Sequence, residues 1–134
     1  MTFKTVAALV VATTLALPVT GHAFTAENKG KVQSRGGSSF EVAEDRRFGV
    51  PGQWCAAADY AVRVLGAGWT SRIYVQGQGS AKRNVVFGLT PKGASPKSIT
   101  DVAASAKRPG SNFSVQRAFD YCIQQRLPDY LFGR

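Results

Sequence analysis

Cysteine and histidine limit the chemistry that this chain can perform. Its two cysteines are Cys55 and Cys122, and its single histidine is His22. If the residues up to Ala23 form a cleaved signal, as argued below, the mature chain has no imidazole. Ser-His-Asp and Cys-His catalysis need an imidazole to carry a proton, and histidine-ligated metal sites need it as a ligand. We therefore predict no metal site and no cofactor, and we expect a protein that is not an enzyme.

The two cysteines are expected to form one internal disulfide. Their even number and an oxidising compartment favour the bond, with two buried free thiols or an intermolecular bond as alternatives. Closing a loop of this length would stabilise the fold by roughly 4 kcal/mol in the chain-entropy description. A redox pair usually has its cysteines close in sequence. Cys55 and Cys122 are far apart in sequence, so a structural role is favoured.

Three carboxylates, Glu41, Glu44 and Asp45, precede the best predicted helix. Paired carboxylates act as acid and base in glycoside hydrolysis. Near the end of a strand, however, these side chains need not converge. The alternative is a solvated turn in which Arg46 and Arg47 are the partners of the carboxylates.

The N-terminus has the three-part order of a secretory signal. Lys4 precedes an apolar run over 6–17, and Gly21-His22-Ala23 places small residues where a signal peptidase reads. A helix over that run would be about 18 Å long, whereas the hydrocarbon core of a membrane is about 30 Å thick, so a transmembrane anchor is the weaker alternative. We predict a signal peptide at 1–23, export to the periplasm or the medium, and no membrane span after cleavage.

The chain is basic, with a net charge of +9, and much of the excess lies between Lys82 and Arg108. A basic surface attracts nucleic acid, anionic lipid or acidic protein, although a solvated loop is the ordinary alternative. Residues 92–108 contain no aromatic side chain on which bases could stack, so we see no nucleic-acid motif. The expected partner is a protein or an anionic envelope component, and the oligomeric state stays open.

Hydrophobic periodicity predicts the elements that must position these residues. Residues 24–38 are polar and predict a flexible N-terminal arm, followed by a single domain over 39–134. Within it we predict a strand at 39–43, a helix at 53–65, a hairpin of strands 72–76 and 84–90, a short turn of helix within 99–106, a helix at 115–126 capped by Ser114, and an apolar tail at 129–134 that packs on the core.

Each cysteine lies on the apolar face of its predicted helix. The expected fold is therefore α+β, in the order β-α-β-β-α: a small three-stranded antiparallel sheet with two helices on one face, tied by one disulfide. Asp59 and Arg63 should pair on the exposed side of the first helix. Trp69 is expected to be buried as a plug of the core, and Gly88 to mark a bulge or a close backbone approach.

One local pattern carries a resemblance. The segment Trp54-Cys55-Ala56-Ala57-Ala58-Asp59-Tyr60-Ala61, with Arg72-Ile73-Tyr74-Val75 downstream and a second cysteine in a C-terminal helix, resembles short exported proteins of alphaproteobacteria of unassigned function. The resemblance covers residues 40–125. It implies export and a disulfide, and it brings no active site.

The predicted outer face of the sheet is the best candidate for recognition, because Tyr and Arg are favoured at interface hot spots. An ordinary half-polar sheet face is the alternative. Our hypothesis is a small exported binding protein that recognises an envelope protein, or inhibits an enzyme, through a basic surface. The other hypotheses are a glycan-acting enzyme that uses carboxylates and a charge-driven binder of polyanions or membrane surfaces. The candidate binding residues are Arg72, Tyr74, Gln76, Lys82, Arg83, Lys97, Lys107 and Arg108.

Overall fold

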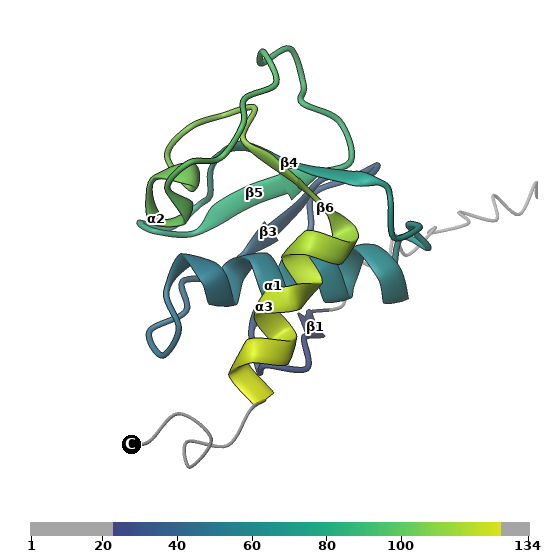
Figure 1. Cartoon of the computed structure of the whole chain (residues 1–134), viewed down its shortest axis with the longest axis vertical. Coiled ribbons are helices and arrows are strands. Elements are labelled where there is room, and N and C mark those ends of the chain that lie inside the picture. The colour runs from purple at the N-terminus through teal and green to yellow at the C-terminus, as the bar shows by residue number, and fades with distance from the viewer. Residues whose placement is uncertain (1–22, 127–134) are drawn as a thin grey trace, which may run out of the picture.

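The computed structural model describes residues 23–126, in which an antiparallel sheet carries the helices on one face (Figure 1). Within this range the strand order is β1-β2-β3-β5-β4-β6. The predicted signal peptide, apart from Ala23, and the predicted apolar tail lie outside the described residues. The elements are β1 Phe24–Thr25, β2 Lys31–Ser34, β3 Phe40–Val42, α1 Val50–Arg63, β4 Arg72–Gln78, β5 Val85–Gly88, α2 Val102–Ser105, β6 Asn112–Ser114 and α3 Val115–Arg126.

The α+β class, both long helices and the β4–β5 hairpin are confirmed, but the three-stranded sheet is wrong. The described sheet has six strands, because β1, β2 and β6 join the three that were predicted. β2 pairs with β3 through Val32 and Val42, and β6 pairs with β4 through Phe113 and Ile73. The additional strands contain two to four residues, which is too short for a period of two to be recognised.

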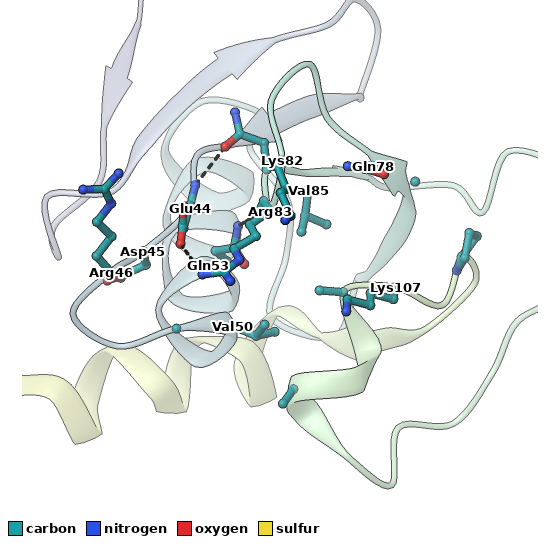
Figure 2. Close-up of a pocket in the computed structure, with 16 residues that line it drawn as sticks. Glu44, Asp45, Arg46, Val50, Gln53, Gln78, Lys82, Arg83, Val85 and Lys107 are labelled. Carbon is teal, nitrogen blue, oxygen red and sulfur yellow. Dashed lines mark hydrogen bonds and ion pairs between the residues drawn. The ribbon is translucent and has the colours of Figure 1, made fainter.

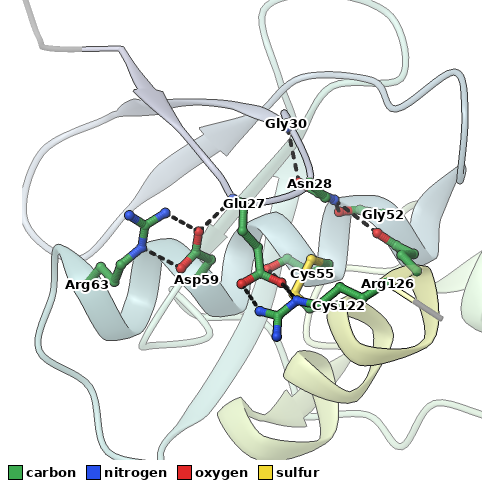
Figure 3. The surroundings of a disulfide bond; sticks show 10 residues. Glu27, Asn28, Gly30, Gly52, Cys55, Asp59, Arg63, Cys122 and Arg126 are labelled. Carbon is green, nitrogen blue, oxygen red and sulfur yellow. Dashed lines mark hydrogen bonds and ion pairs between the residues drawn. A yellow bond between two sulfur atoms is a disulfide. The ribbon is translucent and has the colours of Figure 1, made fainter. Parts of the chain in front are cut away.

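Helix α1 is buried on nearly every side. Its residues from Gly52 to Ala61 are all buried, whereas an amphipathic helix would keep one polar face exposed to solvent along its length. The sheet covers one side of α1, α3 crosses another, and the β1–β2 turn covers a third (Figures 1 and 3). Four alanines between positions 56 and 61 let these neighbours approach closely, while Trp54 fills the space against Phe87 and Phe113.

The predicted disulfide is present and joins α1 to α3. The Cα atoms of Cys55 and Cys122 are 4.9 Å apart, and both residues are at most 1% exposed. The prediction placed both helices on one face of the sheet, but α3 packs chiefly on α1 and reaches the sheet at β6. The Ser114 hydroxyl accepts a hydrogen bond of 3.1 Å from the Arg117 N–H, which confirms the predicted cap.

The predicted flexible arm is wrong, because its turn is bonded to both helices (Figure 3). The Glu27 carboxylate pairs with Arg126 on α3. The Asn28 amide donates a hydrogen bond of 2.8 Å to the Gly52 carbonyl on α1, and the Glu27 N–H donates one of 2.9 Å to Asp59. Glu27 and Asn28 therefore satisfy polar groups of the helices, whereas other polar residues of the arm, such as Lys29 and Gln33, are exposed.

Two side chains have the opposite exposure to that predicted. Asp59 is 3% exposed, so its carboxylate needs the two bonds of 2.6 and 2.5 Å that Arg63 donates. Trp69 is 52% exposed and packs edge-on against Phe119, with ring centroids 5.4 Å apart. Trp54 already occupies the centre of the core, which leaves Trp69 on the surface.

A β-bulge at Gln76 changes the direction of side chains along β4. The pairing steps from Val75 opposite Phe87 to Gly77 opposite Val86, and Gln76 is the additional residue. The Gln76 amide lies over Gly88, where an added Cβ would come within 2.1 Å of its nitrogen. Gly88 is thus closely approached by a side chain and not by backbone as predicted, and the bulge is on the partner strand.

We predict that the double substitution C55A/C122A lowers the free energy of unfolding by roughly 4 kcal/mol, because the bond closes a long loop. Urea denaturation of the oxidised protein and the variant measures the difference. A loss below about 1 kcal/mol would contradict the role of the disulfide as the tie between α1 and α3.

Candidate functional site

A pocket of about 1010 Å³ opens where the start of α1, the end of the β4–β5 hairpin and the segment after α2 meet (Figure 2). We call it the basic pocket. This volume is of the size that takes a drug-sized ligand. It is lined by Glu44, Asp45, Arg46, Gly49, Val50, Gln53, Gly77, Gln78, Lys82, Arg83, Asn84, Val85, Ala103, Ala106, Lys107 and Pro109.

Gln53 fastens the walls of the basic pocket to one another. It lies in the first turn of α1, is 3% exposed, and donates a hydrogen bond of 2.8 Å to the carbonyl of Arg83. Its amide nitrogen also lies 3.4 and 3.3 Å from the carbonyls of Val42 and Ala43. One buried amide therefore joins α1, the end of β3 and the β4–β5 loop.

The β4–β5 loop is held in an unusual conformation. Arg83 has a φ of 69°, in the left-handed region that a residue with a side chain seldom adopts. Its carbonyl accepts the bond from Gln53, and its guanidinium forms an ion pair of 3.1 Å with Glu44. The bond to the Arg83 carbonyl and the ion pair of its guanidinium together stabilise this backbone conformation.

Glu41 holds the other side of the same loop. It is 5% exposed on the sheet face opposite α1, and it accepts bonds of 2.7 Å from the Ser80 hydroxyl, 2.5 Å from the Ser80 N–H, 3.2 Å from Asn84 and 2.6 Å from Arg35. Burial alone would raise the pKa of Glu41, but the hydrogen bonds from Ser80, Asn84 and Arg35 outweigh it and lower the pKa to about 2.

Positive charge dominates the rim of the basic pocket. Lys82 and Arg83 come from the hairpin side and Lys107 from the segment after α2 (Figure 2), while Arg46 follows β3. Within residues 23–126, Arg83 has an ion pair with a carboxylate, and Arg46, Lys82 and Lys107 have none. The pocket also contains the start of α1, whose first turn has no acidic residue and no side-chain cap.

The structure divides the eight predicted binding residues among separate places. Lys82, Arg83 and Lys107 line the basic pocket. The remaining five are elsewhere: Arg72, Tyr74 and Gln76 belong to the sheet face turned away from α1, and Lys97 and Arg108 lie outside the pocket. The candidate residues are therefore not gathered at one place: Arg72, Tyr74 and Gln76 belong to the sheet face opposite the one that carries α1 and the basic pocket.

The residues outside the pocket have structural contacts of their own. Arg72 donates a hydrogen bond of 2.9 Å to Asn112, and the Gln76 amide donates one of 2.8 Å to the carbonyl of Thr90. The Lys97 ammonium donates one of 2.9 Å to the carbonyl of Pro109. This bond of Lys97 joins the segment before α2 to the segment after it.

Of the three predicted carboxylates, Glu44 and Asp45 line the basic pocket and Glu41 does not, and all three have partners in the fold. Glu41 points away from the basic pocket and is held by four bonds, Glu44 pairs with Arg83, and Asp45 accepts bonds of 2.9 and 2.8 Å from the N–H groups of Arg47 and Phe48. A glycosidase needs a carboxyl group with a raised pKa to donate a proton. The lowered pKa of Glu41 makes it unsuitable for that role.

Sequence reasoning missed several residues of the pocket. Gln53 was assigned only to the start of a helix, and Val50, Ala103 and Ala106 had no assigned role. A polar Gln beside Trp54 at the start of an otherwise apolar helix is the one signal that could have singled out Gln53. The apolar lining has no local signal, because its members come from three separate segments.

A metal site at the disulfide is not supported. The Glu27 carboxylate and the two cysteine sulfurs lie within 4.8 Å of one another. The sulfurs are bonded to each other and offer no thiolate, and Glu27 is paired with Arg126.

Comparison of the chain with protein-family models, with curated proteins and with solved structures finds no match. Among the helices between residues 23 and 126, none has both the length and the apolar character required to cross a bilayer.

We predict that E41Q lowers the free energy of unfolding at pH 7 by about 2 kcal/mol, because a buried acceptor of charge-assisted bonds loses its charge. The folded pKa of Glu41 is below its unfolded value, so its contribution is complete above the unfolded pKa and is lost as the pH falls from about 4.5 to about 2. The variant should therefore lose less stability than the wild type over that range.

Urea denaturation at pH 7, 4.5 and 3 tests this expectation. E44Q is the control, because Glu44 is more exposed and its ion pair should contribute less than about 1 kcal/mol. Equal acid sensitivity of E41Q and the wild type would show that Glu41 does not carry this pH dependence.

Proposed function

We propose that this chain is an exported, disulfide-stabilised binding protein without enzymatic activity, and that the basic pocket binds an anionic ligand or an anionic group of an envelope partner. One observation carries the proposal: a preformed pocket of about 1010 Å³ coincides with four cationic side chains, of which Arg83 alone has a carboxylate partner among the described residues. Fixed cations at a concave site attract anions more strongly than the same charges on a convex surface.

The rigidity of the walls supports binding without a large rearrangement. Gln53 and Glu41 hold the β4–β5 loop from its two sides, so Lys82 and Arg83 extend from a fixed backbone. A preformed site loses less conformational entropy when the ligand binds.

Export is supported by the buried disulfide and by the signal-like pattern of residues 1–23. Absence of enzymatic activity is supported by the lack of histidine after His22. The glycan-acting enzyme gains no support from Glu41, Glu44 and Asp45, each of which has a partner in the fold.

Export has a direct test. We expect the full-length chain, expressed in a Gram-negative host, to be recovered from the periplasm with Phe24 as its first residue and without free thiols. Intact mass and thiol labelling measure both properties. Recovery of the uncleaved chain in the cytoplasm with two free thiols would contradict export.

The binding site is tested with two variants of equal charge. K82Q/K107Q removes two cations from the basic pocket, and K92Q/R108Q removes two exposed cations outside it. We expect citrate at low salt to shift the amide resonances of the pocket residues in the wild type and in K92Q/R108Q. In K82Q/K107Q the affinity should fall about tenfold, since each lost charge pair costs about 0.5–1 kcal/mol.

Heparin retention separates this proposal from a binder driven by net charge. If binding depends on net charge alone, both variants should elute from heparin at the same salt concentration, below that of the wild type. Counterion release depends on the number of cations that bind and not on where they lie. If the basic pocket is the site, citrate should bind more weakly to K82Q/K107Q than to K92Q/R108Q. Equal loss of citrate binding in both variants would contradict the basic pocket as the site.

A further inference from the structure

The basic pocket has a charged rim and an apolar interior, and this combination restricts the ligand further. Lys82, Arg83 and Lys107 are exposed at the rim. Val85 is 2% exposed and offers almost no surface to a ligand, but Val50 and Ala106 are half-buried and Ala103 is exposed. A ligand that only neutralised the rim would leave this apolar surface in contact with water, which is unfavourable compared with covering it.

Two of the side-chain amides that line the pocket, Gln53 and Asn84, already have partners in the fold. The Gln53 nitrogen donates to the Arg83 carbonyl, the Asn84 oxygen accepts a bond of 3.0 Å from the Glu44 N–H, and the Asn84 nitrogen donates to Glu41. A ligand rich in hydroxyl groups, such as an oligosaccharide, would find these two amides occupied and would depend on the exposed Gln78 and on the charged side chains. The interior therefore favours an apolar ligand body over a polar one.

The lining also argues against nucleotides. Among the residues that form the pocket within the described chain, none is Phe, Trp or Tyr. Proteins that bind bases without pairing usually stack them on aromatic rings. Phosphate alone could meet the cations, but a base would find no ring to stack on.

We propose that the ligand of the basic pocket is an amphipathic anion: an organic acid with one carboxylate or phosphate head that meets Lys82 and Lys107, and an aliphatic body that packs on Val50, Ala103 and Ala106. This inference rests on the proposed function. It adds the chemical class of the ligand, in which the head supplies orientation and the body supplies most of the affinity.

Calorimetric titration of the full mature protein with straight-chain acids of four, six, eight and ten carbons tests the apolar body. The affinity should rise with each pair of methylenes, by up to about fourfold for each methylene that is fully buried, until the chain fills the pocket. Comparing the affinities of octanoate and octyl phosphate shows whether the pocket prefers a carboxylate head or a phosphate head. Octyltrimethylammonium, which has the same aliphatic body and the opposite charge, should bind at least tenfold more weakly than octanoate.

The variants locate the binding. K82Q/K107Q should lose at least tenfold in affinity for octanoate, and K92Q/R108Q should bind it as the wild type does. Affinity that is independent of chain length, with citrate binding still lost in K82Q/K107Q, would overturn the amphipathic ligand and leave the proposed function standing. If neither citrate nor any of the acids binds, both the inference and the proposed function are wrong.

Discussion

The burial of α1 from Gly52 to Ala61 is the constraint on which the rest of the structure depends. A helix enclosed in this way can contain large side chains only where a neighbour leaves space, which is why alanine recurs around Trp54. Its polar residues must find partners inside the protein, and Asp59 and Gln53 both do. The disulfide at Cys55 then fixes α3 against a helix that already has the sheet on another side. Loosening α1 would disturb the sheet, α3 and the pocket together.

The parts of the fold that could be predicted are those with a repeating local pattern. The apolar period located α1 and α3, alternation located β4 and β5, and Ser114 gave the start of α3. The arm was missed because Glu27 and Asn28 act through bonds to residues far along the chain, and such bonds leave no local period. Trp69 was misplaced because aromatic character predicts burial on average and cannot say which of two tryptophans occupies a single central space.

The candidate site was predictable in its charges and not in its shape. Lys82, Arg83 and Lys107 stand out by type, but the sheet decides that they lie on a different side from Arg72 and Tyr74. The carboxylate that seemed suited to chemistry, Glu41, instead determines where the cations stand, because its bonds to Ser80 and Asn84 shape their loop. Glu41, on one face of the sheet, thus stabilises the loop that carries Lys82 and Arg83 near the other face.

The bulge at Gln76 has a consequence for how this protein can vary in length. Before the bulge, Tyr74 belongs to the face turned away from α1; after it, Gln78 pairs opposite buried Val85 and lines the basic pocket. Inserting or deleting one residue in β4 would exchange these two faces downstream of the change. Length variation in the loop after Gly79 leaves the pairing of β4 intact. Homologous chains should therefore keep the spacing between Ile73 and Gln78 constant, and those that keep the basic pocket should also keep the length of the loop that carries Lys82 and Arg83.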